Sequence, residues 1–181
     1  KLLSGAEFAV QEGFKFVALV HDVTGWGNLC EFISAARGRA AKGTYCVSWH
    51  DGDLASLQGC EILLVLPSAI KLEAAYAITT RAKALFGRHI WLVVELLLGL
   101  DDDVVLHRLQ QVSRLTGVPL VAAGNVHMHV RSRKPLQDVI TAVRLGKPVS
   151  ECGFELQANA EAHLRSRERL AAIYPPELLA N

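Results

Sequence analysis

The sequence predicts an α/β protein, because short apolar runs alternate along the chain with segments of helical periodicity. The composition agrees with a folded globular chain, since 51% of the 181 residues are hydrophobic and 20% are charged. The alternation favours parallel strands joined by crossover helices, either in a barrel or in an open, doubly wound sheet. From these patterns alone, both architectures remain open.

Four apolar runs have the length and composition of strands that are buried on both faces. They span residues 16–20 (FVALV), 62–66 (ILLVL), 90–98 (IWLVVELLL) and 119–123 (PLVAA). Each run is too short for a transmembrane helix, which needs about 20 apolar residues. We therefore expect core strands and no association with a membrane.

Four segments repeat apolar residues at helical spacing. They lie around residues 29–36, 70–86, 105–112 and 136–145. Gly38 and Gly117 are expected to end the first and the third of these helices. Three aspartates at residues 101–103 suit the positive end of the third helix dipole. Residues 158–173 are expected to form an exposed, charged helix.

Charge and cysteine content limit the function classes. The formal net charge of +1 indicates no general affinity for nucleic acid, although a local basic patch is possible within a balanced total. The four cysteines form no C-x-x-C pair, so we expect reduced thiols. The chain starts without a signal peptide, which makes the cytoplasm the expected compartment. Met128 is the only methionine, so the sequence is expected to be a piece of a longer protein.

Polar residues follow the run at residues 119–123, where the carboxyl ends of strands meet in α/β folds. Asn125, His127 and His129 alternate, so an extended backbone would point them to the same side. Imidazole suits Zn, Fe or Mn, but a metal site normally needs three or more protein ligands. A metal-binding role and ordinary surface or core histidines both remain open.

Further polar residues lie near the expected strands. Glu7 lies two residues after Gly5 in an apolar segment, and it could ligate a metal or simply be exposed. Glu95 lies within a predicted strand and needs a partner, or a raised pKa, if it is buried. For the residue pair His21 and Asp22, and for residues 49–51 (WHD), a capping or loop role is favoured over a role in the site.

A cluster of cations follows the histidines. Arg131, Arg133 and Lys134 come first, and Arg144 and Lys147 close the next predicted helix. Clustered cations suit the phosphate of a substrate or of a nucleic-acid backbone. An ordinary helix-terminal charge cluster is an equal alternative.

One long segment, VPLVAAGNVHMHVRSRKPLQDVITAVRLGKPVSE at residues 118–151, resembles the polymerase and histidinol phosphatase (PHP) region of bacterial error-prone C-family DNA polymerases. Other motifs match the same family in the same order: SGAEF (4–8), GWGNLCEFISAAR (25–37), KGTY (42–45), IWLVVELLLGLDDD (90–103) and NAEAHLRSRERLAAIYPPELL (159–179). The resemblance implies the later part of a distorted (βα)7 PHP barrel over residues 1–150. It also implies that residues 151–181 form a helical linker leading toward a polymerase palm.

The resemblance further implies a degenerate metal site. Glu7 matches a family carboxylate and His127 matches a family histidine. Asn125 stands where an aspartate is usual, and Lys15 takes a position that is histidine in metal-bound relatives. An amide and an ammonium should weaken cation binding. We therefore expect no cofactor or only a weakly held divalent metal here, with Mg²⁺ in the palm of the parent polymerase.

The leading hypothesis is a non-polymerising scaffold segment of an error-prone DNA polymerase that acts in DNA replication, DNA repair and translesion synthesis. A first alternative is a PHP-type metal-dependent phosphoesterase, in which Glu7 and His127 bind metal and Arg131 or Arg133 holds phosphate. A second alternative is a module that binds DNA or a subunit through Arg131, Arg133 and Lys134. The expected partners are DNA, the remaining polymerase domains, the sliding clamp and damage-tolerance accessory proteins.

Overall fold

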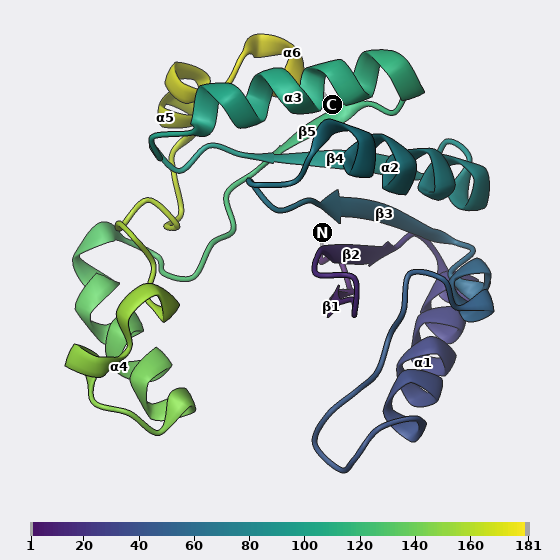
Figure 1. The fold of residues 1–181 in the computed structure, drawn as a ribbon, viewed down its shortest axis with the longest axis horizontal. Helices are drawn as coiled ribbons and strands as arrows, with labels where there is room; N and C mark the ends of the chain where they lie inside the picture. Colours follow the sequence, from purple (N-terminus) through teal and green to yellow (C-terminus); the bar gives the residue numbers. More distant parts are fainter. Residues whose placement is uncertain (1, 180–181) are drawn as a thin grey trace. The chain divides into compact units, whose positions relative to one another are not determined.

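The computed structural model describes residues 2–179 as two compact units (Figure 1). The first unit comprises Lys1–Val94 and Val104–Val121, and the second comprises Glu95–Asp103 and Ala122–Asn181. Strands and helices are mixed along the chain, which confirms the predicted α/β class. The predicted boundary between residues 150 and 151 stays a prediction.

Within residues 2–179, one sheet contains five strands in the order β1-β2-β3-β4-β5. The strands are β1 (Gly5–Ala9), β2 (Lys15–Val20), β3 (Cys60–Val65), β4 (Ile90–Glu95) and β5 (Leu120–Ala123). Strands β2 to β5 correspond to the four apolar runs of the sequence. β3 and β4 are parallel, whereas β1 pairs antiparallel with β2, and β2 pairs antiparallel with β3. The expectation of parallel strands throughout is therefore wrong for the first part of the sheet.

The antiparallel pairing of β2 and β3 follows from the path of the chain between them. Helix α1 (Val23–Gly38) leaves the end of β2, and residues 39–59 then return to the edge from which it left. Val20 pairs with Cys60, and the backbone N–H of His21 donates to the carbonyl of Gly59 at 2.9 Å. A strand that starts where its neighbour ends has to run in the opposite direction.

Strand β1 was not among the predicted strands, because it is buried on one face only and forms no continuous apolar run. Within it only Phe8 is buried, while Gly5, Glu7 and Ala9 are exposed. β1 joins β2 through a tight turn at Gly13, whose φ of 84° suits glycine. Phe8 stacks on Phe16, with ring centroids 5.1 Å apart, and so connects the hairpin to the core.

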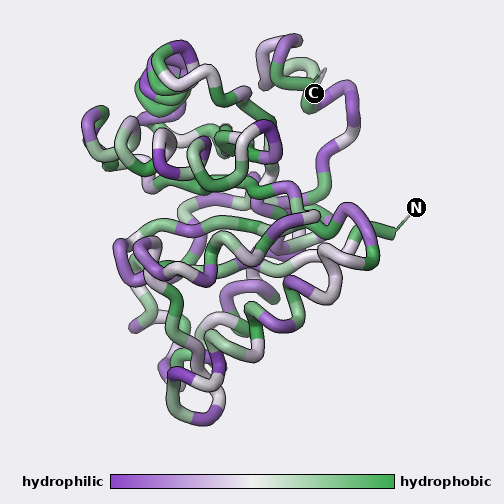
Figure 2. The backbone as a smooth tube through the Cα atoms, turned by 90° about the vertical axis from the view of Figure 1, so that its right-hand side faces the viewer, coloured by the Kyte–Doolittle hydropathy of each residue, from purple (hydrophilic) through white to green (hydrophobic). Residues whose placement is uncertain are grey.

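The core of the first unit lies between the sheet and its helices. Phe16 and Leu64 on β2 and β3 are fully buried, and Phe32 on α1 packs edge-on against Phe8 with ring centroids 5.0 Å apart. Figure 2 shows hydrophobic residues along the strands and alternating hydrophobic and hydrophilic residues along the helices. This pattern follows from helices that bury one face only.

The remaining helices are α2 (Leu72–Phe86), α3 (Asp102–Thr116), α4 (Lys134–Leu145), α5 (Arg167–Ile173) and α6 (Pro176–Leu179). Helices α1 to α4 confirm the four predicted segments. α1 ends at Gly38, and α3 ends before Gly117, which has a positive φ of 67°. Asp102 and Asp103 lie in the first turn of α3, as their charge suggested. Among residues 2–179 no helix is long and apolar enough to cross a membrane.

Two predicted elements are shorter than expected. β4 ends at Glu95, so residues 96–98 are not in the strand, and the predicted helix at 158–173 begins only at Arg167. Tertiary hydrogen bonds explain both differences. Asn159 Nδ2 donates to the carbonyl of Leu97 at 2.7 Å, and Arg165 Nη1 donates to the carbonyl of Leu96 at 2.8 Å. These bonds hold both segments in irregular backbone conformations.

The four cysteines are free thiols, as predicted. Cys60 and Cys152 are buried, whereas Cys30 is exposed and Cys46 is partly exposed. Burial is the largest influence on Cys60 and raises its pKa, and the nearby Asp22 carboxylate adds to the effect. Cys60 is therefore a core thiol that stays protonated at neutral pH.

Candidate functional site

The segment that follows β5 turns sharply at Asn125. This residue has a φ of 42°, which asparagine tolerates better than most residues. The turn breaks the extended geometry that would have aligned Asn125 with the two histidines. Asn125 Nδ2 instead donates to Glu95 Oε2 at 3.3 Å. Glu95 is half-buried, and this hydrogen bond gives it the partner that a buried carboxylate needs.

His127 and His129 lie on either side of a buried residue, Met128. The backbone N–H groups of His127 and Met128 both donate to the carbonyl of Ala162, at 2.9 and 3.2 Å. These bonds hold the two histidine side chains at the surface. Both line a pocket of about 400 Å³ together with Met128, Arg133, Leu136, Gln137 and Ile140. The structure thus brings the two histidines to one pocket, and Asn125 does not line it.

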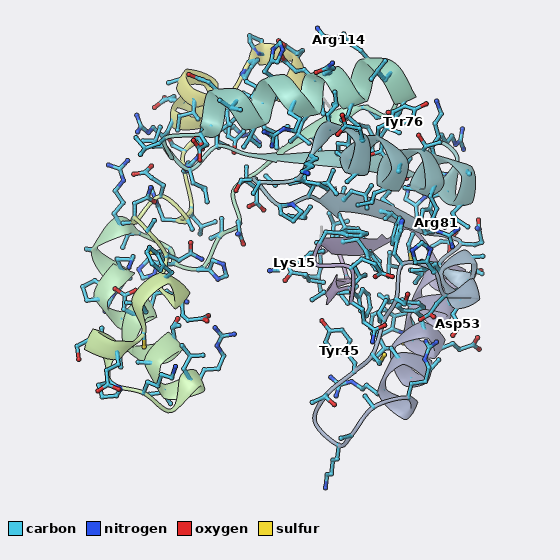
Figure 3. The ribbon with its side chains drawn as sticks, in the orientation of Figure 1. Lys15, Tyr45, Asp53, Tyr76, Arg81 and Arg114 are labelled. Carbon is cyan, nitrogen blue, oxygen red and sulfur yellow. The ribbon has the colours of Figure 1, made fainter. Side chains whose placement is uncertain are left out.

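Glu7 lies on β1, in the first unit. Its Oε1 is 2.9 Å from Lys15 Nζ on β2, and both side chains are about half exposed. Lys15 is labelled in Figure 3. An exposed ion pair of this kind contributes little stability, about 0–1 kcal/mol, but it places an ammonium beside the candidate carboxylate. In the described part of the chain, no three His, Cys, Asp or Glu side chains gather where they could hold a metal ion. The metal role of Glu7, Asn125 and His127 stays a prediction.

The basic stretch after the histidines is largely ion-paired. Lys134 Nζ lies 2.6 and 2.8 Å from the two carboxylate oxygens of Asp138, one helical turn later in α4. Arg131 Nη2 lies 2.7 Å from Glu161 Oε1. Arg133 is exposed and lines the histidine pocket. Of the three predicted phosphate contacts, two therefore already have an anionic partner in the chain.

A buried pair that sequence reasoning missed lies next to this stretch. Glu161 is 8% exposed as a residue, and the side chain of Arg165 is 1% exposed. Arg165 Nη2 donates to the carbonyl of Glu161 at 3.0 Å and lies 3.9 Å from its Oε2. Arg165 lies within residues 158–173, for which the sequence predicts an exposed, charged helix. The alternating arginines of HLRSRER would fit an irregular, half-buried segment equally well.

Several other polar residues have structural roles. Asp22 accepts a hydrogen bond from the backbone N–H of Gly25 at 2.8 Å and caps α1. Asp51 accepts from the backbone N–H of Ser48 at 3.0 Å and pairs with Arg39 at 3.2 Å. These contacts confirm the capping and loop roles that were favoured for the two aspartates.

Glu61 on β3 is a carboxylate of the first unit that both neighbouring side chains of β4 and its preceding turn hold by hydrogen bonds. Burial acts to raise its pKa, but the hydrogen bonds that its oxygens form with His89 Nδ1 at 2.8 Å and accept from Trp91 Nε1 at 2.9 Å outweigh that effect. The pKa of Glu61 is therefore held below its ordinary value of 4.5. No local pattern in the sequence predicts this cluster, because its members come from β3, β4 and the turn before β4.

Comparison with known proteins identifies the lineage. No protein-family model matches the chain. Over 99% of its length, the chain is 43% identical to the error-prone DNA polymerase of Azoarcus sp., 42% identical to that of Methylococcus capsulatus and 41% identical to that of Dechloromonas aromatica. The chain is homologous to a segment of the error-prone DNA polymerases. It spans 17% to 18% of the length of these relatives. The resemblance to error-prone DNA polymerases is thereby confirmed, whereas the PHP barrel stays a prediction.

Proposed function

We propose that the chain is a non-polymerising scaffold segment of an error-prone DNA polymerase that acts in DNA replication and damage tolerance. The observation that carries this proposal is the match of 99% of the chain to about a sixth of the polymerase relatives. Nucleotide transfer needs carboxylates that hold Mg²⁺ against the reacting phosphate. No such cluster is found among residues 2–179, and we assign the Mg²⁺ site to another part of the parent enzyme.

Helix α4 supports a scaffold role. Leu136, Val139, Ile140 and Val143 are between 48% and 76% exposed and follow the i, i+3, i+4, i+7 spacing of one helix face. We call these four residues the α4 stripe. Contiguous apolar surface of this kind marks a place where another protein surface packs. We propose that the remaining polymerase domains, rather than the sliding clamp or accessory proteins, cover the α4 stripe in the cytoplasmic enzyme.

The metal content of the protein separates this proposal from a PHP-type phosphoesterase. Two features support weak metal binding: Glu7 has an ammonium beside it, and Asn125 offers a neutral amide. After dialysis, elemental analysis should find far less than one zinc or manganese ion per chain. Hydrolysis of p-nitrophenyl phosphate in added Mn²⁺ should stay at background. Stoichiometric metal together with turnover would favour the phosphoesterase instead.

A chimera tests the scaffold role directly. This chain would replace the homologous segment of the Azoarcus polymerase, and primer extension in Mg²⁺ would be measured for the chimera and for the chain alone. The chimera should extend the primer and the chain alone should not. Changing Ile140 and Val143 of the stripe to Asp should reduce extension by the chimera. The matched control is Val104→Asp on α3, which charges an exposed valine outside the stripe. Extension by the chain alone, or equal loss in both chimera variants, would contradict the proposal.

A further inference from the structure

We infer that the second unit carries a pocket for a phosphate monoester, lined by the exposed arginines Arg131 and Arg169, with the buried cation Arg165 beside them. The pocket has a volume of about 620 Å³, and its polar lining consists of Arg131, Ser132, His163, Arg165, Ser166 and Arg169. It is distinct from the histidine pocket, which Arg133 lines. The inference rests on the geometry of this unit and holds whether or not the parent protein is a polymerase.

Arg165 supplies a fixed, buried cation beside the pocket. Its side chain is 1% exposed, and two of its donors are used by the carbonyls of Leu96 and Glu161, at 2.8 and 3.0 Å. Its Nε–H is buried and has no hydrogen-bond partner within residues 2–179. Because this group is enclosed, Arg165 would act on a bound anion through its charge, and the exposed Arg131 and Arg169 would supply the direct donors.

The charges around the pocket favour a dianion. Three guanidinium groups are present, and one carboxylate, Glu161, pairs with two of them. Three positive charges against one negative charge leave a formal surplus of two. Glu161 does not line the pocket, so its oxygens do not face a bound anion directly. A phosphate monoester carries a charge of about −1.5 to −2 at pH 7 and matches this surplus.

Neutral donors add to the arginines. Ser166 Oγ accepts from the backbone N–H of Arg169 at 3.2 Å as the N-cap of α5, which leaves its hydroxyl hydrogen able to donate. Ser132 offers a second hydroxyl. Arginine forks and hydroxyl groups together are the usual means of holding phosphate oxygens. The volume falls within the range of about 300–1,000 Å³ for small-molecule pockets, so a nucleotide can follow its phosphate into the site.

The phosphate could belong to a free nucleotide or to the 5′ end of a DNA strand, and binding assays distinguish these sources. Fluorescence anisotropy would compare single-stranded oligonucleotides of about ten residues, labelled at the 3′ end, with and without a 5′-phosphate. Inorganic phosphate and thymidine monophosphate would serve as competitors, at constant ionic strength. We expect the competitors to bind, and a tighter complex with the 5′-phosphorylated strand if a DNA end is the source. No competition and no preference for the phosphorylated strand would overturn the inference.

Neighbouring arginines provide matched controls. Arg169→Ala removes an exposed pocket arginine whose side chain has no hydrogen-bond or ion-pair partner within residues 2–179, and Arg167→Ala removes the same charge two residues earlier in α5, outside the pocket. We expect Arg169→Ala to weaken binding of thymidine monophosphate about tenfold, since a charge-assisted bond is lost, and Arg167→Ala to change it less than about twofold. Arg131→Ala and Arg133→Ala form a second such pair, with thermal melts to verify folding. Equal losses within both pairs would indicate non-specific charge attraction and overturn the pocket. The assays contain neither Mg²⁺ nor nucleoside triphosphates, so their outcome is independent of the primer-extension result.

Discussion

Removing the hydroxyl of Tyr174 should destabilise the second unit, because two buried hydrogen bonds are lost. The tyrosine is 3% exposed, and its hydroxyl accepts from the backbone N–H of Leu96 at 3.0 Å and donates to the carbonyl of Ala123 at 2.7 Å. It thereby joins the end of α5 to the ends of β4 and β5. Burial is the largest influence on the pKa of Tyr174 and raises it, so the hydroxyl remains a donor throughout the neutral range.

The expected cost of Tyr174→Phe is about 2–3 kcal/mol. Two lost hydrogen bonds contribute about 1 kcal/mol each, and the buried N–H of Leu96 is left without an acceptor. For a chain of this length, such a loss lowers the Tm by about 4–12 °C. Thermal and urea denaturation followed by circular dichroism would measure the change. Amide hydrogen exchange at Leu96 should also become faster.

Two more exposed tyrosines serve as controls for this prediction, and both are labelled in Figure 3. Tyr45 is 39% exposed and accepts from the backbone N–H of Ala9 at 2.8 Å, so Tyr45→Phe should cost about 0.5–1 kcal/mol. Tyr76 is 43% exposed, and within residues 2–179 its hydroxyl forms no hydrogen bond. Tyr76→Phe should therefore change the free energy of unfolding by no more than about 0.5 kcal/mol. If Tyr174→Phe were no more destabilising than Tyr76→Phe, the reasoning would be refuted.

Three further predictions concern the first unit. Gly25→Ala should lower the Tm markedly, because the added methyl group would overlap the carbonyl of Gly59, and an unchanged Tm would show that the α1 contact is not tight. Asp22→Ala should cost about 1 kcal/mol in urea denaturation through loss of the α1 cap, whereas Asp22→Asn should cost less. Glu61→Gln should reduce the free energy of unfolding at pH 7. The pKa of Glu61 is lowered in the folded protein, so the stabilisation by its carboxylate is present above the ordinary value of 4.5 and is lost as the pH falls through the folded pKa. The free energies of unfolding of the two proteins should therefore converge in acid. A difference in free energy that does not change with pH would contradict this.

The elements that the sequence predicted best are those set by local patterns. The apolar runs became β2 to β5, since a continuous stretch of Val, Leu and Ile is stable only where both faces are covered. Helices α1 to α4 formed where apolar residues recur at helical spacing, and Gly146 ends α4 in the left-handed conformation. The motifs alone also predicted the relationship to error-prone DNA polymerases, because such a relationship is carried by the order of residues along the chain.

The candidate site was less predictable, because backbone turns decide where its side chains point. Asn125, His127 and His129 would share one side of an extended segment, but the positive φ of Asn125 removes it from that side. The two histidines reach a common pocket through backbone bonds to Ala162, a residue far along the sequence. Such distant bonds have no local signal.

The sequence by itself determined the α/β class, the position of most strands and helices, and the relationship to error-prone DNA polymerases. Only the tertiary structure decided the direction of the first strands, since the return of residues 39–59 sets where β3 begins. It also decided which charges are buried: Arg165 looks like an exposed helical arginine in the sequence and is enclosed by Glu161 and the carbonyl of Leu96. Local patterns depend on neighbours in the chain, whereas strand direction and the pairing of buried charges depend on which distant segments meet.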